Sequence, residues 1–162
     1  MWPFTKSTRK TRADSYSDYT TPEQFLDGSR CARLTSDERA VVERRLSAFD
    51  GRMVHPEIAA DMFGVFAAAG LATYGLDIVR DAEGMESEAE RTELLGAALS
   101  ALQNSDMIYP HPALKAHLAE LLEAIGRSAD ANRIRNEASR DEATRTVKET
   151  DQILLADLTY RL

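Results

Sequence analysis

Residues 111–138 read HPALKAHLAELLEAIGRSADANRIRNEA and carry apolar side chains three and four positions apart on either side of Gly126. That spacing is typical of amphipathic helices, and a glycine between two such helices predicts a turn. Residues 55–82, HPEIAADMFGVFAAAGLATYGLDIVRDA, align with this stretch without gaps. The two stretches are identical at His55/His111, Pro56/Pro112, Ala60/Ala116, Ala68/Ala124, Gly70/Gly126, Ile78/Ile134 and Ala82/Ala138. The sequence therefore predicts two helical hairpins, turning at Gly70 and Gly126.

Further helices are predicted over 22–27, 36–50, 88–103 and 148–162, with a loop over 104–110. Thr35 with Glu38, and Ser87 with Glu90, stand three positions apart, which is the spacing of a helix-starting capping box. The predicted fold class is all-α, a stack or bundle of about six to seven helices with two helix-turn-helix units. We expect a flexible basic and aromatic tail over 1–20, a helical domain over 21–147 and a C-terminal amphipathic helix over 148–162.

The net charge of −7 is unevenly distributed along the 162 residues. Residues 1–12 carry four basic side chains and no acidic one, so the body of the chain is more acidic than the total suggests. Nucleic-acid binding depends on neutralising phosphates, so no nucleic-acid partner is expected. The single cysteine, Cys31, excludes an intramolecular disulfide and favours a reducing compartment, which predicts a cytoplasmic location.

No stretch is expected to span a membrane. The longest run without a charged side chain covers residues 62–76. That run is shorter than the ~20 residues that a spanning helix needs. Residues 1–12 also lack the apolar region of a secretory signal.

Small and large apolar residues follow a characteristic order in the second hairpin: Leu118, Ala119, Leu122, Gly126, Ala131 and Ala138. In this order and spacing the hairpin resembles a unit of the tetratricopeptide repeat (TPR). The first hairpin follows the pattern less closely, through Met62, Phe66, Gly70, Gly75 and Ala82. The TPR-like resemblance implies a stack of hairpins whose concave face binds peptides or protein partners, without catalysis. The units begin 56 residues apart, against a repeat length of about 34. An unrelated helical bundle is therefore the alternative.

Residue types that catalyse reactions or bind metals are sparse and poorly spaced. His111 and His117 are six positions apart and face different sides of a helix, and His55 and His111 precede prolines at predicted helix starts. Cys31 has cationic neighbours but no adjacent histidine to activate it. Because the chain also lacks a glycine-rich phosphate loop and a di-metal carboxylate pattern, we expect no cofactor, no metal and no enzymatic activity.

Acidic residues gather just before and within the start of the predicted helix 88–103: Asp81, Glu83, Glu86, Glu88 and Glu90. The simplest interpretation is a solvated helix start, because acidic side chains near a helix N-terminus interact favourably with its dipole. The docking of a basic partner is the alternative.

These patterns predict a non-catalytic protein–protein interaction or assembly module, such as an adaptor or accessory subunit. The partner-binding residues expected between the hairpins are Glu57, Asp61, Lys115, Glu120, Arg133 and Arg135. Those expected in terminal docking segments are Trp2, Phe4, Leu154 and Leu158. The C-terminal apolar stripe either packs on the chain's own core or docks on a partner or a second copy.

Two other classes remain open. Residues 1–12 combine aromatic and basic side chains, which suit an anionic membrane surface or an acidic protein groove. The first of these would make the protein a peripheral membrane factor. The remaining class is a small helical enzyme without a recognisable motif.

Overall fold

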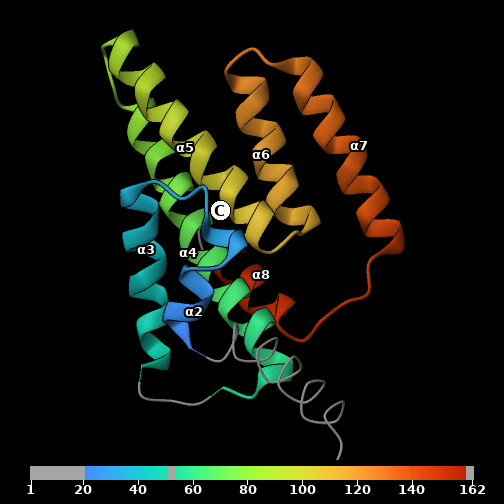
Figure 1. Cartoon of the computed structure of the whole chain (residues 1–162). Helices are drawn as coiled ribbons and strands as arrows, with labels where there is room; N and C mark the ends of the chain where they lie inside the picture. Colours follow the sequence, from blue (N-terminus) through green and yellow to red (C-terminus); the bar gives the residue numbers. More distant parts are fainter. Residues whose placement is uncertain (1–20, 51–53, 160–162) are drawn as a thin grey trace, which may run out of the picture.

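The computed structural model describes residues 21–50 and 54–159, which are predominantly helical (Figure 1). The α-helices are α2 (Pro22–Leu26), α3 (Ser36–Leu46), α4 (Pro56–Glu83), α5 (Glu88–Ile108), α6 (Pro112–Ala124), α7 (Ser128–Thr144) and α8 (Asp151–Thr159). Short 3-10 turns occupy Ser29–Cys31 and Ser47–Phe49, and the described ranges contain no strand. The predicted all-α class and number of helices are confirmed. The predicted tail and residues 160–162 lie outside the described ranges.

The central helix, α4, runs without interruption through Gly70. The predicted turn at Gly70 is therefore wrong, and the first predicted hairpin is one helix. A Cβ added at Gly70 would lie 2.5 Å from Arg45 Cγ, and one added at Gly75 would lie 3.3 Å from Ala101 Cβ. These glycines allow α3 and α5 to approach α4 closely, and they do not end the helix.

Within the described residues, α4 is the helix long and apolar enough to cross a membrane, judged by length and composition, with a mean hydropathy of 1.6. In the folded chain 61% of its apolar stretch is buried, because α3, α5 and α8 pack on it. The ring of Phe63 meets Phe25 and Phe49 edge to face, with centroids 5.9 and 5.1 Å apart. The apolar composition of α4 thus serves the core of the bundle.

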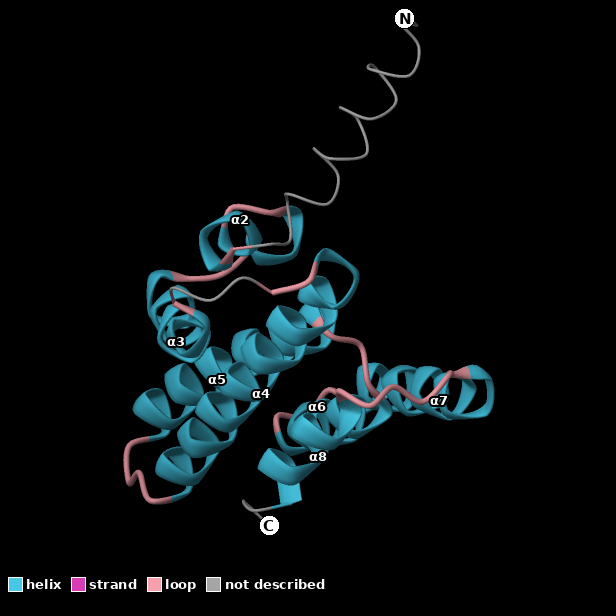
Figure 2. Ribbon diagram, turned by 90° about the horizontal axis from the view of Figure 1, so that it is seen from below, coloured by secondary structure: helices cyan, strands magenta, loops and turns pink. Residues whose placement is uncertain are grey.

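Helix α5 lies alongside α4 (Figures 1 and 2) and runs on through residues 104–108, so the predicted loop is wrong there. The polar residues Asn104 and Ser105 suggest a loop, but in the structure their side chains are buried and hydrogen-bonded to neighbouring helices. Asn104 Nδ2 donates to Glu38 Oε1 at 2.6 Å, and Ser105 Oγ donates to the Ala68 carbonyl oxygen at 2.7 Å. Because α3 and α4 supply these acceptors, α5 remains helical across buried polar side chains.

Helices α6 and α7 form the second predicted hairpin, which is confirmed. Gly126 makes the turn with a φ of 83°. This left-handed conformation suits glycine, which has no Cβ to clash. Helix α7 packs on α6 and lies at the edge of the molecule (Figure 2), with only Ala131 and Ile134 of its residues buried.

Helix α8 packs on α4. Its apolar stripe is buried within the chain, since Leu154 is 0% exposed and Leu158 is 3% exposed. Of the two alternatives for this stripe, packing on the chain's own core is the one observed. The prediction that Leu154 and Leu158 contact a partner is wrong for this structure, because neither side chain reaches the surface.

Candidate functional site

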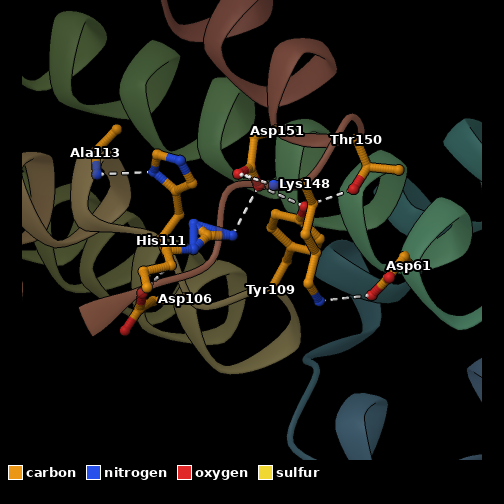
Figure 3. A network of polar contacts seen from close by, with 9 residues as sticks. Asp61, Asp106, Tyr109, His111, Ala113, Lys148, Thr150 and Asp151 are labelled. Carbon is orange, nitrogen blue, oxygen red and sulfur yellow. Dashed lines mark hydrogen bonds and ion pairs between the residues drawn. The ribbon is translucent and has the colours of Figure 1, made fainter. Parts of the chain in front are cut away.

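A polar cluster joins the end of α5 to the segment that precedes α8 (Figure 3). We call it the Asp151 cluster, and it consists of Tyr109, Arg145, Lys148, Thr150 and Asp151. The Asp151 carboxylate accepts hydrogen bonds from Tyr109 Oη at 2.6 Å, Arg145 Nη2 at 2.7 Å and the Lys148 backbone N–H at 3.0 Å. Asp151 is 3% exposed, so these donors replace the water that the carboxylate loses on burial.

The two acidic groups of the Asp151 cluster have pKa values shifted in opposite directions. Burial and the hydrogen bond to Asp151 raise the pKa of Tyr109, so its hydroxyl remains protonated. Burial alone would raise the pKa of Asp151, but hydrogen bonds from Tyr109 and the Lys148 N–H, with the charge of Arg145, outweigh it and lower the pKa. The neutral Tyr109 phenol donates to the ionised Asp151 carboxylate, and this hydrogen bond holds the start of α8 against the end of α5.

The segment between α7 and α8 is also attached to α4. Lys148 Nζ lies 3.0 Å from Asp61 Oδ1, and the Lys148 ammonium lies 5.8 Å from the centroid of the Tyr109 ring. Asp61, predicted to face a partner, is therefore engaged within the chain. The Asp151 cluster and this ion pair together hold the segment that leads into α8.

Lys115, predicted to project into an exposed groove, is buried with its side chain 7% exposed. Its Nζ lies 2.9 Å from Asp106 Oδ1 of α5 and 3.2 Å from Asp141 Oδ2 of α7. Burial lowers the pKa of Lys115, but the two carboxylates outweigh burial and raise it, so the ammonium remains charged. The prediction that Lys115 faces a partner is wrong, because this side chain connects three helices.

His111 is the N-cap of α6. Its Nδ1 accepts a hydrogen bond from the Ala113 backbone N–H at 3.0 Å, which places the hydrogen of the neutral ring on Nε2. Burial and the charge of Arg145 lower the pKa of His111 and favour this neutral form. The ring lines a cavity of about 510 Å³ between α6, α7 and α8. Its role in the fold is to cap a helix.

An apolar groove of about 360 Å³ opens between the C-terminal part of α4, the first turns of α5 and the end of α6. We call it the α4–α6 groove, after the helices on its two sides. Its apolar lining comprises Leu76, Val79, Ala82, Leu95, Leu102, Leu121 and Ala124. Leu76, Val79 and Leu95 are half-buried and Ala124 is exposed, so the fold leaves part of this apolar surface open.

The rim of the α4–α6 groove is acidic. Glu83 of α4 and Glu120 of α6 line it and are exposed, beside the half-buried His117 of α6. The rim cation Arg91 donates to the Met85 carbonyl oxygen at 2.7 Å and so holds the turn between α4 and α5. Across residues 77–93 there are seven acidic and two basic side chains. An apolar floor with an acidic rim suits an apolar side chain carried on a basic segment.

The structure does not gather the predicted partner-binding residues into one groove. Glu120 lines the α4–α6 groove, whereas Arg133 borders a separate cavity of about 640 Å³ between α5, α6 and α7. Arg135 forms an ion pair with Glu123 at 3.0 Å, and Glu57 is exposed at the start of α4. Of the predicted residues, Glu120 lines the α4–α6 groove, and partner binding by this side chain stays a prediction.

Sequence reasoning missed the apolar floor of the groove. Leu76, Val79 and Leu95 follow the helical period, and that period alone does not separate a core residue from one that lines a groove. Trp2 and Phe4, the predicted N-terminal docking residues, lie outside the described ranges.

Cys31 is buried, and burial raises its pKa to about 11 against the opposing charges of Arg39 and Arg30. No group of three or more His, Cys, Asp or Glu side chains within the described ranges is placed to hold a metal ion.

Comparisons of the chain with models of known protein families, with curated proteins and with solved structures found no match. The resemblance to the tetratricopeptide repeat therefore remains a prediction, carried in this fold by the α6–α7 hairpin alone.

Proposed function

We propose that this protein is a non-catalytic interaction module that binds a segment of a partner protein in the α4–α6 groove. The observation that carries the proposal is the apolar floor left open between three helices, with exposed acidic side chains around it. Protein interfaces bury apolar anchors at their centre and surround them with a polar rim. The groove has both parts of such an interface.

The groove is formed by helices that pack on one another within the isolated chain. Helices α4 and α5 are in close contact where Gly75 faces Ala101, and Arg91 fastens the turn between them. Ligand pockets commonly have volumes of about 300–1,000 Å³. At about 360 Å³ the groove suits one or two anchoring side chains of a peptide.

The non-catalytic character of the proposal rests on how the buried polar groups are used. The Asp151 carboxylate is held by three donors, Lys115 lies between two carboxylates, and His111 caps α6. Each of these groups contributes to the attachment of one helix to another. Their arrangement favours stability over reaction chemistry.

A matched pair of substitutions tests the proposal. Ala124→Phe fills the edge of the groove, whereas Ala143→Phe makes the same change at an exposed position of α7 outside the groove. Affinity purification from the source organism should recover a stoichiometric partner with the wild type and Ala143→Phe but not with Ala124→Phe. Unchanged circular dichroism would show that all three chains fold. Retention of the partner by Ala124→Phe would remove the groove as its binding site.

A further inference from the structure

We propose that residues 1–12, MWPFTKSTRKTR, occupy the α4–α6 groove of the same molecule and that a partner must displace them. This inference rests on the proposed function of the groove and names the chemistry that the groove recognises, an aromatic anchor on a basic segment. Three features of the chain support it: complementary charge, a matching apolar floor and sufficient reach.

The first support is charge. Residues 1–12 carry four basic side chains and no acidic one. The groove is lined by the exposed acids Glu83 and Glu120 beside Arg91, and residues 77–93, which include Glu83, carry seven acidic and two basic side chains. Complementary charge steers two surfaces together and disfavours wrong pairings. Because single exposed ion pairs contribute little, charge selects the segment and apolar contacts supply most of the affinity.

Helix stability does not account for all the acidic side chains at this end of the bundle. Glu88 and Glu90 lie in the first turn of α5, where negative charge interacts favourably with the helix dipole. Asp81 and Glu83 lie in the last turn of α4, where the same dipole disfavours negative charge. Neither has an ion-pair partner among the described residues. Of these two, Glu83 lines the groove, where a basic segment would meet it.

The second support is the apolar floor. Trp2 and Phe4 are the two aromatic residues of the basic segment, two positions apart. An aromatic side chain buries about 150–250 Å² when it is enclosed. The groove, at about 360 Å³, offers half-buried Leu76, Val79 and Leu95 for such a contact.

The third support is reach. Phe25 is anchored on Phe63 of α4, with ring centroids 5.9 Å apart. Val79 lies sixteen residues beyond Phe63, or about 24 Å at the rise of an α-helix. Phe4 precedes Thr21 by seventeen residues, which span at most about 56 Å when extended. The segment is therefore long enough to reach the groove within one molecule.

Trp2 is the only tryptophan of the chain, so its fluorescence reports on the segment directly. The full-length wild type is compared with Glu83→Lys/Glu120→Lys, which reverses both exposed acids of the groove. The control Glu57→Lys/Glu149→Lys makes the same change of charge at exposed positions elsewhere. We expect blue-shifted, acrylamide-protected Trp2 emission in the wild type and the control. The groove variant should show the emission of a synthetic peptide of residues 1–12.

Filling the groove provides an independent readout. Ala124→Phe should expose Trp2 to acrylamide, and Ala143→Phe should leave it protected. The proposal would be overturned if the wild-type emission equalled that of the free peptide. It would also be overturned if Glu57→Lys/Glu149→Lys and Ala143→Phe lost as much protection of Trp2 as the groove variants to which they are matched. Protection that disappears on dilution would place the segment on a second copy. Protection that arises only with phosphatidylserine-containing vesicles would assign the segment to a membrane surface. Loss of protection on dilution and protection only with vesicles each contradict docking within one molecule.

The proposed function and this inference fail separately. If Ala124→Phe loses a partner while Trp2 of the wild type is solvent-exposed, the groove binds a partner without the N-terminal segment. If Trp2 is protected and Ala124→Phe retains every partner of the wild type, the segment occupies a groove that partners do not use.

Discussion

Two substitutions of glycine by alanine should change the stability of this protein in opposite directions. A Cβ added at Gly75 of α4 would lie 3.3 Å from Ala101 Cβ, from the Ala98 carbonyl oxygen and from Leu102 Cγ. A Cβ added at Gly96 of α5 would meet no atom within 4 Å. The pair therefore tests whether α4 and α5 approach each other as closely as the structure has them.

The magnitudes follow from two opposing effects. Alanine in place of a glycine inside a helix stabilises by about 0.5–1 kcal/mol, because glycine loses more backbone freedom on folding. Gly96→Ala should raise the free energy of unfolding by about 0.5–1 kcal/mol. At Gly75 the same gain is opposed by overpacking, which costs about 1–3 kcal/mol. Ala101 Cβ and the Ala98 carbonyl oxygen are fixed to the α5 backbone and cannot rotate away, so we expect a net loss of about 1 kcal/mol.

Urea and thermal unfolding followed by circular dichroism measure both effects. The two variants should differ by about 2 kcal/mol, which corresponds to about 4–8 °C in Tm for a chain of this size. The difference is the informative quantity, since both variants share the backbone gain. If Gly75→Ala stabilised the protein as much as Gly96→Ala, the close packing of α4 on α5 would be refuted.

Three further changes test the interior. Tyr109→Phe removes a donor from the buried Asp151 carboxylate and should lower the free energy of unfolding by about 1–3 kcal/mol in urea; no change would contradict that hydrogen bond. Leu154→Ala should cost about 2–5 kcal/mol in the same assay, and a cost near zero would contradict the packing of α8 on the core. The folded-state pKa of His111 is lowered, so the folded chain binds fewer protons than the unfolded chain, and stability falls as the pH drops through about 6.5. His111→Asn, which preserves a cap, should flatten that slope in urea titrations at several pH values; an unchanged slope would argue against the lowered pKa.

The starts of α2, α3, α4, α5 and α6 could be predicted from the sequence because capping is local chemistry, whereas α8 begins at Asp151 and not at the predicted residue 148. Thr21, Thr35 and Ser87 each accept a hydrogen bond from the backbone N–H three residues ahead. His55 and His111 accept one from the N–H two residues ahead, next to a proline in the first turn. Every group in these contacts lies within one turn of the chain, so the pattern of residue types is sufficient.

Helix ends and interruptions could not be predicted in the same way, because they depend on distant partners. Gly70 and Gly126 occupy the same place in the aligned stretches, yet only Gly126 adopts a positive φ. Gly70 instead faces Arg45 of α3, whose Nη2 lies 3.3 Å from Thr73 Oγ1. Asn104 likewise remains helical because its acceptor comes from α3. Neither partner is close in the sequence, so local residue types favour a turn or a loop.

The candidate groove could be predicted in part. One acid of its rim, Glu83, belongs to the acidic cluster that is visible in the sequence, and Glu120 follows from its position on the first helix of the second hairpin. The floor depends on the angle at which α6 crosses α4 and α5, which decides whether Leu76, Val79 and Leu95 are covered. That angle is set by packing across the whole bundle, including the buried Lys115, whose ion pairs join three helices.

The Asp151 cluster and the α4–α6 groove lie along different parts of α4, so stability and binding should be separable. Asp61, which pairs with the segment before α8, precedes Leu76 of the groove by fifteen residues, or about 22 Å along the helix. Effects of sites more than about 10 Å apart usually add when they share no partner. Tyr109→Phe should therefore reduce stability without changing Trp2 emission under native conditions, whereas reversing the groove acids should change the emission and lower the free energy of unfolding only by the amount that docking of residues 1–12 contributes. A shift of Trp2 emission in Tyr109→Phe under native conditions would mean that the cluster and the groove are coupled through α4.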